Sequence, residues 1–149
     1  MESHTYQTSI EWKKERIGVL SSPELQESFD VATPPNFKGG VPNIWSPEHL
    51  YTASVNSCYM TTFLAIAENS KLNFTSFSCD AKGILEMKDG KYLMTEVELL
   101  AHLTIEQEAE REKAEKVLQK SEKACLISNS ITAKVNLITD IRVLSAVTN

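Results

Sequence analysis

Three residues of this sequence are suited to redox or nucleophilic chemistry, the cysteines Cys58, Cys79 and Cys125. Cys79 lies in a segment with the pattern of a strand and without a distinctive flank, so we expect it to fill space in the core. Cys58 and Cys125 each lie in a segment predicted to be helical, on a face that should turn inward. Two inward thiols can meet as a redox pair, but periodicity alone favours two buried structural cysteines.

A zinc site is a weaker interpretation of the same cysteines. The sequence contains no Cys-x-x-Cys pair, and His49 and His102 show no spacing typical of metal ligands. A zinc-dependent hydrolase is therefore only a third hypothesis for the function, after the two given below, and a metal analysis could exclude it. We expect no metal, flavin or haem.

Composition limits the class of protein. A chain of 149 residues is long enough for one domain, which we expect to span residues 1–149. A net charge of −5 and an isoelectric point near 5.2 disfavour nucleic acid and anionic membrane surfaces as partners. The start of the sequence lacks a basic and apolar leader pattern, and three cysteines are too few for a disulfide scaffold. We therefore expect a cytoplasmic protein.

The elements that must position these cysteines follow from local patterns. Residues 5–12, 17–20 and 28–31 read as short strands, and a loop rich in proline and glycine follows at 33–40. Ser46-Pro47-Glu48 predicts a helix start, because serine is a favoured N-cap and proline fits the first helical position. Residues 49–67 contain no Asp, Glu, Lys or Arg, so we expect this helix to be enclosed by protein on most sides.

The second half predicts a long hairpin, a helix and a last strand. Residues 73–87 and 91–105 flank Asp89-Gly90, a tight-turn signal. Residues 106–125 read as a charged amphipathic helix, and residues 132–143 as a strand. The fold class predicted is α+β.

Two segments resemble the OsmC/Ohr family of osmotically inducible and organic hydroperoxide resistance proteins. Residues 46–58, SPEHLYTASVNSC, are similar to that family's "N/S-P-E-x-L-x-A-A-x-x-A-C" segment, and residues 124–129, ACLISN, to its "C-P-x-S-N/K" segment. The resemblance covers residues 6–143. It implies an intertwined homodimer in which antiparallel sheets enclose two central helices per chain.

The resemblance also implies a cysteine-based peroxidase active in the stress response. Cys58 would attack an organic hydroperoxide and become a sulfenic acid, and Cys125 would condense with it to a redox-active disulfide. A dithiol reductant protein of the lipoyl type would restore the thiols, with no cofactor bound. Glu48 matches the family's Pro-Glu pair, and Arg16 matches its arginine if residues 16–34 align without gaps to "R-x-G … A-T-P".

The chemistry explains why such residues are needed. A thiol with a pKa of about 8.5 is mostly protonated at neutral pH, whereas the thiolate is the nucleophile. Cys58 lies too deep in its helix for the helix dipole to help, so the Arg16 guanidinium is the expected source of positive charge, held by Glu48. Ten helical residues separate Glu48 from Cys58, which is about 15 Å. We therefore hypothesise that Glu48 acts from the partner subunit or after a break in the helix.

A second function remains open at this point. Leu126 stands where many family members have proline, and Ile127 where the hydroperoxide-resistance branch often has tyrosine. These departures leave room for a non-catalytic OsmC-like dimer that binds a small apolar ligand and whose thiols are structural or redox-sensing. Counting free thiols after treatment with a hydroperoxide would separate the two.

Overall fold

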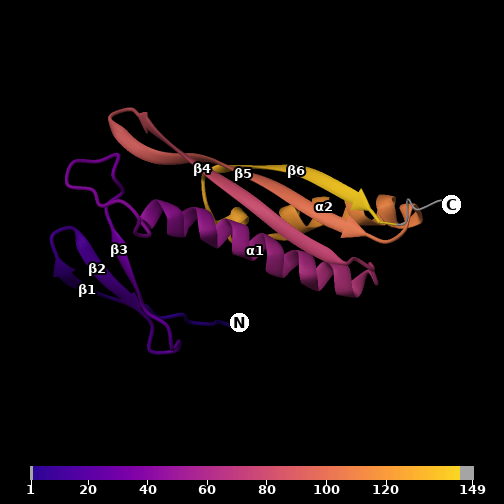
Figure 1. Ribbon diagram of the computed structural model, residues 1–149, viewed down its shortest axis with the longest axis horizontal. Coiled ribbons are helices and arrows are strands. Elements are labelled where there is room, and N and C mark those ends of the chain that lie inside the picture. The colour runs from indigo at the N-terminus through magenta and orange to yellow at the C-terminus, as the bar shows by residue number, and fades with distance from the viewer. Residues whose placement is uncertain (1, 145–149) are drawn as a thin grey trace. The chain divides into compact units, whose positions relative to one another are not determined.

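The computed structural model describes residues 2–144, and they fall into two compact units divided between Leu50 and Tyr51 (Figure 1). The expectation of a single domain over residues 1–149 stays a prediction.

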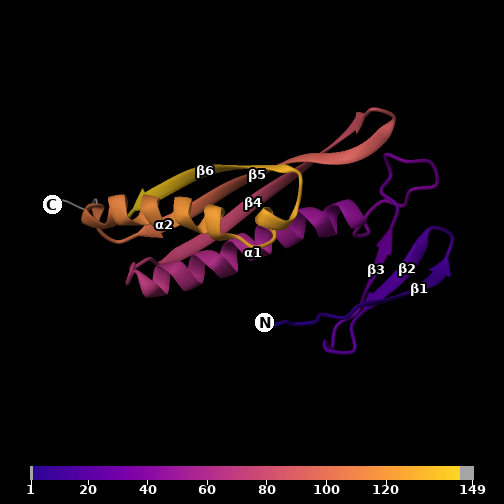
Figure 2. The same cartoon turned by 180° about the vertical axis from the view of Figure 1, so that it is seen from behind.

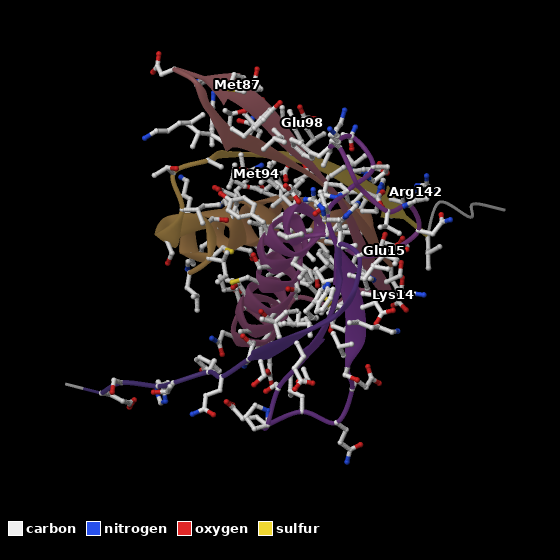
Figure 3. The ribbon with its side chains drawn as sticks, turned by 90° about the vertical axis from the view of Figure 1, so that its left-hand side faces the viewer. Lys14, Glu15, Met87, Met94, Glu98 and Arg142 are labelled. Atoms are coloured by element: carbon white, nitrogen blue, oxygen red, sulfur yellow. The ribbon has the colours of Figure 1, made fainter. Side chains whose placement is uncertain are left out.

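The first unit is built on a three-stranded antiparallel sheet. Its strands are β1 (Ser9–Lys14), β2 (Ile17–Ser21) and β3 (Phe29–Ala32), in the order β1-β2-β3. Lys14, the last residue of β1, and Glu15, in the turn to β2, are labelled in Figure 3, and Glu15 has a positive φ of 49°. The three predicted strands are confirmed, although the first begins at Ser9 rather than at residue 5.

Helix α1 (Pro47–Asn69) begins where the sequence predicted. Ser46 is fully buried, and its Oγ accepts a hydrogen bond from the His49 backbone N–H at 3.1 Å. The same hydroxyl pairs with His49 Nδ1 at 2.7 Å, which fixes the side chains of the first turn. Pro47 has no N–H that needs a partner, so it fits the first position of the helix. Together with the Ser46 hydroxyl, it gives the start of the helix the expected N-cap structure.

The second unit contains the long hairpin. Strands β4 (Ser76–Lys88) and β5 (Lys91–Ile105) pair antiparallel, and Met87 lies near the outer end of their hairpin (Figure 3). Asp89 and Gly90 connect them with φ values of 50° and 79°, which confirms the tight turn.

The chain returns to this sheet through a helix. A 3₁₀ turn (Glu108–Glu110) precedes α2 (Arg111–Ala124), and a second 3₁₀ turn (Ser128–Ser130) precedes β6 (Lys134–Val143). β6 pairs parallel with β5, so the sheet β4-β5-β6 is mixed rather than wholly antiparallel. The reason is topological: a helical crossover brings the chain back to the end of the sheet from which β5 started. The α+β class is confirmed.

The core of the second unit lies between one face of the sheet and both helices, as the two views show (Figures 1 and 2). Alternate residues of β5 from Val97 to Ile105 point inward, and α2 contributes Ala114, Val117, Leu118 and Ser121. From α1, Tyr59 and Phe63 are fully buried, and Phe63 stacks on Phe77 at 4.5 Å between ring centroids. The buried residues of α1 are spaced four residues apart and form one stripe along the helix: Val55, Tyr59, Phe63 and Ala67.

One side of α1 remains exposed in the single chain. Met60 and Leu64 are 40% and 42% exposed. The expectation that this helix is enclosed on most sides is therefore not met within one chain. Among the described residues, no helix is long and apolar enough to cross a membrane.

Candidate functional site

Two of the three cysteines come together in the second unit. Cys58 lies near the middle of α1, and Cys125 follows the last residue of α2. Their side chains form a hydrogen bond, with Cys58 partly accessible and Cys125 fully buried. The two thiols are therefore in direct contact although they are far apart in the sequence.

The surroundings of Cys58 favour its thiolate. Burial by itself raises the pKa of Cys58, but hydrogen bonds from the Ile127 backbone N–H, the Cys125 thiol, the Thr62 hydroxyl and the Leu126 backbone N–H outweigh burial, and the pKa lies below its ordinary value. The Thr62 Oγ1 lies 3.9 Å from Cys58 Sγ. Donors aimed at a sulfur stabilise its charged form.

The surroundings of Cys125 favour its neutral thiol. Burial raises its pKa, and although Ser128 donates toward the sulfur through its hydroxyl and its N–H, the nearby Cys58 raises the pKa further. The pair therefore contains one thiol whose pKa is lowered and one whose pKa is raised, and the second donates a hydrogen bond to the first.

The turn that follows Cys125 is part of the site, and sequence analysis missed it. Both backbone donors to Cys58 come from this turn, at Leu126 and Ile127. In the sequence these two positions stand out only as departures from a family pattern. A backbone N–H is the same in every residue except proline, so the one signal available was the absence of proline at position 126.

Arg16 and Glu48 belong to the first unit. Arg16 lies at the turn between β1 and β2 and is exposed, and its guanidinium packs over Gly39, where an added Cβ would come within 3.1 Å of Arg16 Nε. Gly39 has a φ of 81°, which also favours glycine. Glu48 lies in the first turn of α1, with its Oε1 buried. The roles predicted for both residues at Cys58 stay predictions.

Cys79 lies apart from this pair, on β4. Burial raises its pKa to about 11, and its backbone carbonyl accepts a hydrogen bond from Asn56 Nδ2 at 3.1 Å. A hollow of about 280 Å³ lies between the Ala53, Ser57 and Met60 side of α1 and residues 77–79. Such a thiol is a poor nucleophile at neutral pH, in agreement with a space-filling role.

His49 and His102 each pair with neighbouring protein side chains. His49 pairs with Ser46, and His102 Nδ1 and Nε2 lie 3.0 Å and 3.2 Å from the carboxylates of Asp140 and Asp80. Within residues 2–144, no group of three or more His, Cys, Asp or Glu side chains is arranged to hold a metal ion.

Comparisons with known proteins agree with this fold. An OsmC-like protein from Vibrio cholerae, described as of unknown function, superposes with a TM-score of 0.81, 21% identity, and coverage of 92% of this chain and 99% of that one. The organic hydroperoxide resistance protein OhrB of Bacillus subtilis gives a TM-score of 0.69 at 18% identity, with 93% and 98% covered.

A sequence relative and a family model complete the comparison. The uncharacterized protein YmaD of Bacillus subtilis is 22% identical over 142 residues, which covers 92% of this chain and 93% of the relative. The model of the family "OsmC-like protein" matches residues 40–140, a stretch that holds both cysteines of the thiol pair and agrees with the resemblance seen in the sequence. This chain belongs to the OsmC-like protein family.

Proposed function

We propose that this protein is a thiol-dependent peroxidase that reduces organic hydroperoxides and is re-reduced by a dithiol. The Cys58 thiolate attacks the outer peroxide oxygen, the O–O bond breaks, and the leaving alkoxide takes a proton to become an alcohol. The resulting Cys58 sulfenic acid condenses with the Cys125 thiol, which forms a disulfide and releases water. A dithiol then exchanges with this disulfide, which returns both thiols and leaves the reductant oxidised.

The observation that carries this proposal is the unequal pair of thiols in contact. Hydrogen bonds lower the pKa of Cys58 although burial opposes them, whereas burial and the neighbouring Cys58 raise the pKa of Cys125. A peroxidatic thiol must ionise, and a resolving thiol must lie beside it to trap the sulfenic acid before further oxidation. The hydroperoxide resistance function of relatives such as OhrB supports the same reading.

Arg16 and Glu48 complete the site that we propose. The Arg16 guanidinium would place a fixed positive charge near the Cys58 sulfur, and the Glu48 carboxylate would hold it by a bidentate ion pair. Helix α1 runs without a break from Pro47 to Asn69, so we retain the hypothesis that Glu48 of the partner subunit serves Cys58.

The same proposal includes a homodimer. The exposed side of α1, with Met60 and Leu64, is an apolar surface on a helix that has no charged residue from 49 to 67. Asn56, beside this surface, has a buried Oδ1 without a hydrogen-bond partner among the described residues. A second copy packed here would cover the apolar side chains and the hollow between α1 and β4.

The decisive experiment counts thiols after one equivalent of cumene hydroperoxide. The protein should lose two thiols, Cys58→Ser should lose none, and Cys79→Ser should behave as the unchanged protein because its thiol lies outside the pair. Cys125→Ser should lose one thiol and accumulate a sulfenic acid that dimedone traps. Unchanged thiols at neutral pH would contradict the peroxidase and favour the non-catalytic dimer that binds a small apolar ligand.

The electron donor is tested by turnover. We propose a reductant of the lipoyl type, acting in the cytoplasm, where reduced dithiols are available. Steady-state peroxide consumption with a lipoyl system should exceed that with a thioredoxin system. The reverse order would overturn the choice of reductant while leaving the thiol chemistry in place.

A further inference from the structure

The turn that follows Cys125 is tightly braced. The Asn129 N–H bonds to the Cys125 carbonyl at 3.1 Å, and the Ser130 N–H to the Ile127 carbonyl at 2.9 Å. Two side chains add to this, since Asn129 Nδ2 reaches the Lys123 carbonyl at 3.1 Å and Ser130 Oγ the Leu126 carbonyl at 2.7 Å. The carbonyl groups of the turn are therefore held in fixed directions, and so are the N–H groups on the same peptide planes.

The first N–H groups of this turn are directed at sulfur rather than at carbonyl oxygens. Among residues 2–144, no carbonyl accepts the N–H of Leu126 or Ile127, and both donate to the Cys58 thiol instead. The next N–H, that of Ser128, serves Cys125. Successive backbone N–H groups that converge on one point are a recurrent way to stabilise an anion.

We propose that the backbone N–H of Leu126 is a working group of the thiol site, which stabilises the Cys58 thiolate and holds its sulfur beside Cys125. This inference rests on the proposed function and adds a donor that lies in the same unit as both thiols. The segment that carries the resolving cysteine thus also activates the attacking one. Cys125 is the titratable side chain that faces Cys58 there, and it donates to the same sulfur.

Position 126 allows this N–H to be removed with little other disturbance. The Leu126 side chain is 66% exposed, so its loss opens no cavity. Cys125 has φ and ψ of −65° and 115°, in the extended region that a residue before proline prefers. Leu126→Pro therefore deletes one donor to Cys58, and Leu126→Ala is the matched control, which shortens the side chain and keeps the N–H.

The experiment measures how alkylation of Cys58 by iodoacetamide depends on pH. Both variants are made in a Cys79→Ser background, and the alkylated peptide is identified by mass spectrometry. A hydrogen bond to a charged group predicts that Leu126→Pro raises the pH midpoint for Cys58 by about one unit. Below both midpoints, alkylation should slow by about tenfold. Leu126→Ala should keep the midpoint of the parent.

A second variant keeps the inference testable if the proline variant misfolds. Cys125 is suited to be the first residue of a ligated peptide, so the protein can be assembled with an ester in place of the amide between Cys125 and Leu126. The ester removes the same N–H without the proline ring and should raise the midpoint in the same direction. A midpoint unchanged in both the ester and the proline variant, or shifted equally in Leu126→Ala, would overturn the inference.

Failure of this inference is distinct from failure of the proposed function. Alkylation needs no peroxide, so it reports on the Leu126 N–H even if the protein reduces no hydroperoxide. If Leu126→Pro still loses two thiols to one equivalent of peroxide at an unchanged rate, and its midpoint for Cys58 alkylation is also unchanged, the peroxidase function is supported. The role of the Leu126 N–H is then refuted.

Discussion

Replacing Gly83 with alanine tests the close approach of α1 to β4. A Cβ added at Gly83 would overlap the Thr52 hydroxyl and lie 3.3 Å from Thr52 Cβ and 2.8 Å from Met94 Cε. The end of Met94 is flexible and can move, whereas the branched Thr52 side chain has only a few χ1 rotamers open to it on the helix. We therefore expect the helix or the strand to shift.

The size of the effect follows from two opposing contributions. Overpacking costs about 1–3 kcal/mol, and replacing glycine by alanine inside a strand recovers about 0.5–1 kcal/mol. The free energy of unfolding should fall by about 1–2 kcal/mol, which for a chain of this length lowers Tm by about 2–8 °C. Thermal unfolding followed by circular dichroism at fixed protein concentration measures it.

A double-mutant cycle identifies the source of the cost. With Thr52→Ala the hydroxyl is gone, so Gly83→Ala should become neutral or slightly stabilising, a coupling of about 2 kcal/mol. Thr52→Val is the matched control, because it keeps the branch in place and removes only the hydroxyl's polarity. If Gly83→Ala costs the same in the alanine and valine backgrounds, the close approach is not its cause.

Two further predictions concern the second unit. Tyr59→Phe should lower the free energy of unfolding by about 1 kcal/mol with an unchanged m-value in urea, because the buried Tyr59 Oη donates to the Leu118 carbonyl at 3.0 Å; equal midpoints would contradict this. Hydrogen bonds to Asp140 and Asp80 raise the pKa of His102 above 6.5, so its stabilising effect should be complete below pH 6.5 and disappear as the pH rises through the folded-state pKa. His102→Gln should lack this dependence in pH-resolved thermal unfolding, and parallel curves for both proteins would refute it.

The elements of this fold were predictable where local chemistry decides them. Ser46 and Pro47 predicted the start of α1 because capping depends on neighbouring residues. Asp89 and Gly90 predicted the hairpin because both residues adopt positive φ. The parallel pairing of β6 was missed because its direction is set by packing of α2 on the sheet, and no local pattern in β6 records it.

The candidate site was predictable only in its side chains. The inward stripes of two helices and the family resemblance singled out Cys58 and Cys125, and the structure brings their thiols into contact. The donors at Leu126 and Ile127 are main-chain groups, so residue type carries almost no information about them. What orients them is the set of hydrogen bonds in the turn, which forms only when α2 and β6 have been placed.

The position of Cys125 between two anchored elements has a consequence for the speed of the proposed cycle. The last residue of α2 directly precedes it, and β6, which pairs with β5 from Lys134 onward, begins shortly after it. Because the two thiols already lie within hydrogen-bonding reach of each other in the reduced state, bond formation between them requires no melting of secondary structure. Such a protein would change between its reduced and oxidised states with little structural rearrangement. Its turnover rate would then be limited by binding of the peroxide and the reductant rather than by refolding.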